Sequence, residues 1–156
     1  TGIAIINPRR FSKLVLVDSV GIKVGGTFDR DIADVFAVSA AELSRISWHD
    51  PSKGPDTKTM TDEELQVFAS DRIAHGLYTW EPYMHNPKLP YRLHRIDIPT
   101  LLIWGVGDGV VTPTYGEAFR DMIPGAKMVV IPDAAHSPHV EQPEAFAKAF
   151  LEFASK

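Results

Sequence analysis

Two apolar runs in the second half of the chain are each followed by one ionisable residue, and this arrangement constrains the fold more than any other feature. The first run, Leu101 to Trp104, stops at a glycine and is followed by Asp108. The second run, Met128 to Ile131, stops at a proline and leads to His136. Such runs are typical of buried strands in a parallel sheet. We therefore expect an α/β fold with an acid and a base at the carboxyl edge of one sheet.

The segment between the two runs predicts a helix that crosses from one strand to the next. Its apolar residues recur at helical spacing, and Thr114 to Glu117 has the spacing of a capping box, which places the predicted start at Thr114. A strand-helix-strand connection makes its two strands parallel neighbours. The residues of the expected apolar stripe are Tyr115, Ala118, Phe119, Met122 and Ile123.

Two segments near the amino end belong to the same pattern. Leu14 to Val17 reads as a third buried strand, and Asp18 follows it either as a turn carboxylate or as an alternative acid at the same sheet edge. Gly2 to Ile6 is ambiguous, because its three isoleucines disfavour an isolated helix and the segment can equally add as a strand. At the other end, Pro143 is expected to start a helix. Its predicted buried stripe is Phe146, Ala149, Phe150 and Phe153.

Between the first strand and the next, the pattern changes to helices broken by loops. The apolar spacing from Ile32 to Leu43 predicts one helix, and Thr61 to Leu65 opens a second with a capping-box pattern. On this second helix Leu65, Phe68, Ala69, Arg72 and Ile73 are expected to share one stripe. Two interpretations of the aromatic side chains in the segment stay open, pocket lining and ordinary packing. These side chains are Trp48, Tyr78, Trp80 and Tyr83.

The residues around the acid and the histidine carry a family resemblance. Gly105-x-x-Asp108-x-x-Val111-x-Pro113, followed by Ala135-His136-Ser137-Pro138-x-x-Glu141-x-Pro143, resembles the acid and histidine segments of α/β-hydrolase-fold enzymes. The resemblance covers nearly the whole chain but only the second half of that fold. It implies a partial α/β-hydrolase fold of three parallel strands with flanking helices, in which residues 1–23 and 94–156 form the core and residues 24–93 form a helical cap.

The resemblance also implies roles for two residues. His136 would be the general base of a Ser-His-Asp triad, and Asp108 would orient it. The nucleophile is not among these 156 residues, since they contain no Gly-x-Ser-x-Gly elbow and no oxyanion loop. The chain also begins without methionine, which is compatible with a processed or excised fragment. Without a nucleophile, the chain alone is expected to be inactive.

Several functions remain open at this point. The first is the carboxyl-terminal portion of an esterase-like serine hydrolase, which acts on a small apolar ester-like substrate when complete. Carbon–carbon bond hydrolases and haloperoxidase-like enzymes are the alternatives within the family, and Ser137-Pro138 after the histidine disfavours the former. A truncated hydrolase that only binds or scaffolds is the alternative outside catalysis. As partner we expect the complementary amino-terminal half, or a second copy paired at the edge of the strand from Leu14 to Val17.

Composition excludes several other classes. A formal net charge of −4 gives no reason to expect nucleic acid. No apolar run approaches the ~20 residues that cross a membrane, and no signal peptide is evident. The absence of cysteine excludes disulfides and is compatible with a cytoplasmic protein. No cofactor is expected, and His136 with His139 is too small a set to predict a metal site.

Overall fold

Three parallel strands form the centre of the protein in the computed structural model, which describes residues 1–26 and 28–155. The strands lie in the order β1-β2-β3, with Leu14 opposite Thr100 and Leu101 opposite Lys127. The expected α/β architecture of three parallel strands is therefore confirmed. The bounds of the strands are β1 Leu14–Val17, β2 Thr100–Gly105 and β3 Lys127–Ile131.

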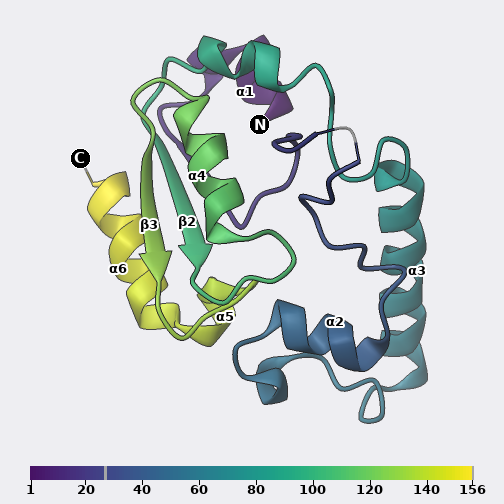
Figure 1. Ribbon diagram of the computed structural model, residues 1–156. Coiled ribbons are helices and arrows are strands. Elements are labelled where there is room, and N and C mark those ends of the chain that lie inside the picture. Colours follow the sequence, from purple (N-terminus) through teal and green to yellow (C-terminus); the bar gives the residue numbers. More distant parts are fainter. Residues whose placement is uncertain (27, 156) are drawn as a thin grey trace.

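Helices cover both faces of the sheet and fill the segment between β1 and β2 (Figure 1). Three short 3-10 helices interrupt the loops at Pro8–Arg10, Pro51–Lys53 and Pro90–Arg95. The α-helices of the described residues are α1 Gly2–Ile6, α2 Ala40–Ser47, α3 Asp62–Thr79, α4 Pro113–Asp121, α5 Pro138–Glu141 and α6 Pro143–Ala154. None of the helices in the described part of the chain combines the length and the hydrophobicity that a membrane crossing requires.

The central strand β2 carries the core, because every one of its residues is buried. Its side chains alternate between the two faces of the sheet. Leu102 and Trp104 pack into the larger apolar cluster, which includes the side chains of α4. Leu101 and Ile103 pack into the smaller cluster on the opposite face, against α6. Figure 1 shows α4 and α6 on these two sides of the sheet. The edge of the sheet that the site uses is thus held from both faces.

The starts of α3 and α4 show which local signals decided the helix boundaries. At α3 the Thr61 hydroxyl accepts a hydrogen bond from the Glu64 N–H and the Glu64 carboxylate accepts one from the Thr61 N–H, so the predicted capping box is confirmed. The predicted start of α4 at Thr114 is wrong. The cap is Thr112, whose hydroxyl accepts from the Tyr115 N–H, and Pro113 occupies the first helical position. Proline suits that position because its N–H would have no partner there.

The predicted helix from residue 32 to residue 43 is also wrong in its first half, because α2 begins only at Ala40. The side chain of Asp34 accepts hydrogen bonds from the N–H groups of residues 36 and 37 at 3.1 Å each. The Val35 N–H donates to the hydroxyl of Tyr83 at 2.9 Å. These bonds take up the backbone donors in a turn, so the apolar side chains at 32 and 35 reach the core without a helix.

The remaining helices resolve the ambiguous predictions. Gly2–Ile6 is a helix rather than a strand, and it buries Ala4 and Ile5. The stripe predicted on α6 is only half-buried, and Phe150 lies outside the core, stacked on Phe146. In α3 no described residue is buried, and Phe68 and Ile73 of its predicted stripe are exposed. The expected cap range 24–93 and the carboxyl-terminal range 94–156 each contain one residue that lies outside the described residues.

Candidate functional site

Asp108 lies in the loop that leaves the carboxyl end of β2 and is almost fully buried. One carboxylate oxygen, Oδ1, accepts hydrogen bonds from the N–H groups of Val110 at 2.8 Å and Val111 at 3.0 Å. A carboxylate that accepts from backbone groups two and three residues ahead folds its own loop into a turn. This local turn fixes the direction of the other oxygen, Oδ2, which faces the loop after β3.

His136 occupies the loop after β3, and its Nδ1 lies 2.9 Å from Asp108 Oδ2. The Asp108 side chain is fully enclosed, while the imidazole keeps about a third of its surface exposed. When Nδ1 carries its proton toward the carboxylate, the second nitrogen, Nε2, is left as the free acceptor. The structure thus brings the two residues predicted from the sequence into direct contact, with the reactive nitrogen available to a third group.

A buried glutamate anchors the loop that carries His136 through hydrogen bonds. Glu141 is 2% exposed, and its two carboxylate oxygens accept from the N–H groups of Ala135 at 2.7 Å and Asp50 at 2.9 Å. The loop also lies directly against the end of β2, where a Cβ at Gly105 would overlap the Ala135 carbonyl oxygen. Only glycine permits this approach. Glu141 is part of the sequence motif around His136, but the motif alone did not predict this anchoring role.

The carboxyl end of α2 is bonded to both loops of the site. The Ile46 carbonyl oxygen accepts from the Gly109 N–H at 2.9 Å, and the Ser47 carbonyl oxygen accepts from the His136 N–H at 3.0 Å. The last carbonyls of a helix have no partner within the helix, so they are free to make such bonds. The helical segment between β1 and β2 therefore helps to set the distance between the acid loop and the histidine loop.

Asp18 lies beside this pair at the end of β1. Its Oδ1 accepts from the Gly105 N–H at 3.0 Å, whereas Oδ2 is buried without a hydrogen-bond partner among the described residues. Its φ of 39° lies in the left-handed region, which is uncommon for residues other than glycine. Burial raises the pKa of Asp18 to about 8, and the charges of Asp108 and Glu141 add to the rise, while the bond from Gly105 opposes it.

Asp18, Asp108 and His136 form a cluster in which each residue offers one ligand-type atom within 4.8 Å of the others. A cation in this cluster would compete with the hydrogen bond that already joins Asp108 to His136. His139, which the sequence offered as a possible second histidine ligand, is not part of the cluster. Its ring packs on Phe146 instead, with 5.9 Å between the ring centroids.

No serine hydroxyl bonds to the His136 ring among the hydrogen bonds of the described residues. Ser19 is the serine closest in sequence to the end of β1, and its hydroxyl donates to the Val17 carbonyl oxygen at 3.1 Å. Ser19 therefore does not donate a hydrogen bond to the second ring nitrogen of His136.

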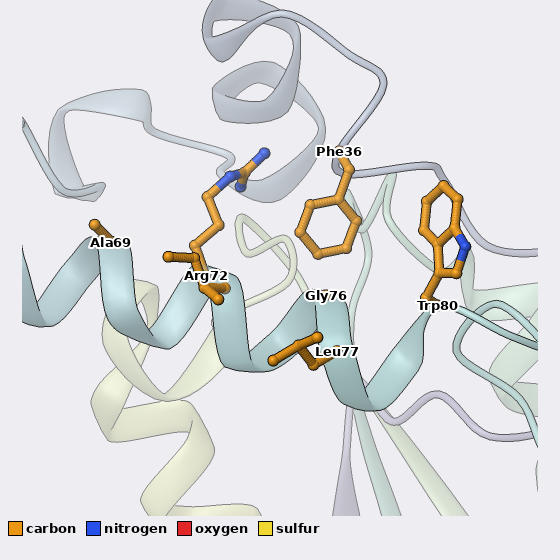
Figure 2. Close-up of a pocket in the computed structure, with 7 residues that line it drawn as sticks. Phe36, Ala69, Arg72, Gly76, Leu77 and Trp80 are labelled. Atoms are coloured by element: carbon orange, nitrogen blue, oxygen red, sulfur yellow. The ribbon is translucent and has the colours of Figure 1, made fainter.

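A separate apolar groove of about 740 Å³ lies along α3 and is lined by Phe36, Ala69, Arg72, Ile73, Gly76, Leu77 and Trp80. Figure 2 shows Arg72 extending from this helix, Trp80 at its end and Phe36 on a neighbouring segment. The Arg72 guanidinium donates to the Val35 carbonyl oxygen at 2.8 Å and lies 5.0 Å from the centre of the Phe36 ring. Trp80 thus lines a groove, whereas the hydroxyl of Tyr83 bonds to backbone and serves packing. None of the residues of the Asp108 cluster lines this groove.

The sequence profile described as the Alpha/beta hydrolase family matches residues 2–149. The chain belongs to the alpha/beta hydrolase family. The arrangement seen here, an acid after β2 and a histidine after β3 of one parallel sheet, therefore lies within a hydrolase fold.

Three similar proteins indicate the range of this family around the chain. A pimeloyl-[acyl-carrier protein] methyl ester esterase of Neisseria meningitidis serogroup B is 38% identical over 61 residues, which are 39% of this chain and 24% of the esterase. A Mycobacterium tuberculosis protein provisionally named non-heme bromoperoxidase BpoC is 44% identical over 109 residues, which are 62% of this chain and 39% of that protein. The crystal structure of 2-hydroxy-6-oxo-6-phenylhexa-2,4-dienoate hydrolase from Rhodococcus sp. strain RHA1 is 20% identical, with a TM-score of 0.73.

The last of these comparisons shows the shared fold and its extent. It covers 99% of this chain and 59% of the Rhodococcus hydrolase. The chain of 156 residues spans less than two thirds of the length of each of the three proteins.

Proposed function

We propose that this chain is the carboxyl-terminal part of an esterase-like serine hydrolase, in which His136 is the general base and Asp108 orients it. The observation that carries the proposal is the 2.9 Å contact between His136 Nδ1 and Asp108 Oδ2 at the carboxyl edge of the sheet. The carboxylate fixes the tautomer with the proton on Nδ1 and stabilises the imidazolium that forms when Nε2 takes a proton. The nucleophile is proposed to come from sequence outside these 156 residues.

The proposed substrate is a small, apolar ester-like compound. The similarity to an enzyme named as a methyl ester esterase supports this chemistry. The similarity to a protein named as a bromoperoxidase keeps a haloperoxidase-like enzyme as the alternative within the same site. A hydrolase acting on a carbon–carbon bond remains a further alternative, with only the shared fold in its support.

The proposed partner is the complementary half of the hydrolase fold. Among the described residues β1 pairs as a strand with β2 alone, so its other edge offers N–H and C=O groups for pairing. A strand from the other half, or from a second copy of the chain, would satisfy these groups. Sedimentation of the purified chain with intact-mass analysis tests this, and a monodisperse 17.3 kDa monomer that unfolds cooperatively contradicts it.

The catalytic roles are tested in the protein that joins this chain to its nucleophile. His136→Ala should lower kcat for a short-chain ester by roughly 10⁴- to 10⁶-fold, and Asp108→Asn by roughly 10⁴-fold. His139→Ala is the matched control, since this histidine is three residues away and packs on Phe146, and it should leave kcat within about twofold. Near wild-type turnover in His136→Ala means that the assignment is wrong.

A second candidate function is a binding or scaffolding module without catalysis. The observation that favours it is the absence of any Gly-x-Ser-x-Gly among these residues. The sequence encoded upstream of Thr1 distinguishes the two. An elbow motif there supports the enzyme, and a start codon directly before Thr1 supports the module.

A further inference from the structure

We propose that Asp18 is held as a neutral carboxylic acid whose O–H faces the Asp108 carboxylate, and that it thereby positions the Asp108–His136 pair. The positioning role rests on the proposed function, whereas the protonation state of Asp18 does not. Asp18 would touch neither the substrate nor the reacting atoms.

The three buried carboxylates near the site differ in the number of hydrogen-bond donors that each one receives. Asp108 receives three, from two backbone N–H groups and from the imidazole of His136. Glu141 receives two backbone N–H groups. Asp18 receives one, from Gly105. Because hydrogen bonds to a carboxylate stabilise its charged form, Asp18 is the carboxyl group of the three that holds a proton most readily.

Asp18 is also buried without the hydrogen-bond partners that would stabilise its charged form. The Asp18 side chain belongs to a residue only 5% exposed, and its Oδ2 has no partner among the described residues. The charged groups that face it are the carboxylates of Asp108 and Glu141 and the imidazole of His136. The imidazole is already paired with Asp108. An ionised Asp18 would therefore be a buried charge beside two others of the same sign, which is costly.

A proton on Asp18 would allow its unpartnered oxygen to donate a hydrogen bond. A neutral carboxyl group has one O–H donor, and a carboxylate oxygen of Asp108 lies within 4.8 Å of an Asp18 oxygen, on the side of the His136 ring. One proton shared between two neighbouring carboxyl groups is the usual outcome when like charges are forced together. In this arrangement the O–H of Asp18 restrains Asp108 and keeps a second negative charge away from the pair at neutral pH.

The direct test is an NMR titration of the Asp18 side-chain carboxyl carbon in the complete protein, with Asp18→Asn used to identify its resonance. The expected result is a carboxyl that stays neutral through pH 7 and ionises around the pKa of about 8 that burial gives it. Ionisation around the ordinary aspartate pKa of 3.8 overturns the proposal. This measurement needs no catalytic activity, so it decides the protonation state even if the proposed function fails.

The positioning role is tested by the pH dependence of kcat/KM for wild type, Asp18→Asn and Asp18→Ala. Asparagine keeps an acceptor for Gly105 and supplies an N–H donor to Asp108, so this variant should retain activity within about threefold at pH 7. Alanine removes both groups and should lose roughly 10- to 100-fold. The wild-type profile should also show an inflection around pH 8, where Asp18 ionises, which the asparagine variant lacks.

Two outcomes overturn the positioning role. If the asparagine variant loses as much activity as the alanine variant, the charge of Asp18 is needed, and it acts as an ionised acid. If the profiles of wild type and Asp18→Asn superimpose over the whole pH range, the residue only supports the backbone at Gly105.

Discussion

The carboxyl edge of the sheet and helix α3 break the ordinary burial pattern in opposite ways. At the sheet edge three acidic residues are buried, namely Asp18, Asp108 and Glu141. In α3 the large apolar side chains are exposed, with Ile73 at 65% and Leu77 at 78%. Charged groups are rarely buried unless they are paired, and exposed apolar patches of this kind mark surfaces that meet something else.

The two regions differ in whether the described residues stabilise the buried charges or cover the exposed apolar side chains. At the sheet edge, backbone N–H groups and His136 satisfy two of the three carboxylates completely, and a proton on Asp18 would satisfy the third. Along α3 nothing in the described part of the chain covers the apolar groove. The acid–histidine pair is thus built within this chain, whereas the apolar face along α3 is left uncovered by the described residues.

A large loss of stability at a fixed pH is expected at Glu141, which anchors the histidine loop. Glu141→Ala would leave the Ala135 and Asp50 N–H groups without their acceptor, and it should cost about 2–4 kcal/mol of stability. Urea unfolding at neutral pH measures this. Glu141→Gln is the matched control, because its amide oxygen retains one of the two bonds, and it should cost about half as much. A loss below about 0.5 kcal/mol in the alanine variant would show that the loop does not depend on this anchor.

An effect that grows with pH is expected at Asp18. Its pKa rises from the ordinary aspartate value of 3.8 in the unfolded chain to about 8 in the folded protein. Between these values the folded state binds more protons, so the stabilising contribution is complete below about pH 4 and is lost as pH rises toward 8. Asp18→Asn has no such group. Its stability relative to wild type should therefore increase by about 1.4 kcal/mol for each pH unit in this window.

Unfolding curves of both proteins at pH 5 and pH 7 provide the measurement. A difference between wild type and Asp18→Asn that does not change between the two pH values would show that Asp18 is ionised in the folded protein at both. An ionised Asp18 at the sheet edge would then need a counter-charge that the described residues do not supply.

The smallest effect is expected on α3. Leu77→Ala removes a side chain that is 78% exposed, so the stability of the chain should change by less than about 0.5 kcal/mol. The matched control is Leu102→Ala in β2, where the same change in a side chain with no exposure should cost about 2–5 kcal/mol. A cost at Leu77 as large as at Leu102 would mean that the apolar face of α3 is already covered in solution, for example by a second copy.

The sequence by itself determined the elements whose signals are local. The strand at Leu14–Val17, the strand before Asp108 and the capping box at Thr61 follow from short-range apolar patterns and from turn and capping residues, and the structure confirms them. The positions of Asp108 and His136 beyond strand ends also followed from the sequence. The carboxyl ends of parallel neighbouring strands meet at one edge, so strand order alone brings the two residues near each other.

Only the tertiary structure decided the features that depend on distant partners. The turn at residues 35 to 38 replaced the first half of a predicted helix, and Tyr83, far along the chain, takes the Val35 N–H. The bond from Asp50 to Glu141 and the bond from Gly105 to Asp18 likewise join residues 91 and 87 positions apart in the chain. Spacing along a sequence reports which face a side chain takes. Whether that face is covered, and whether a buried carboxyl finds a donor, is fixed by long-range packing that no local pattern records.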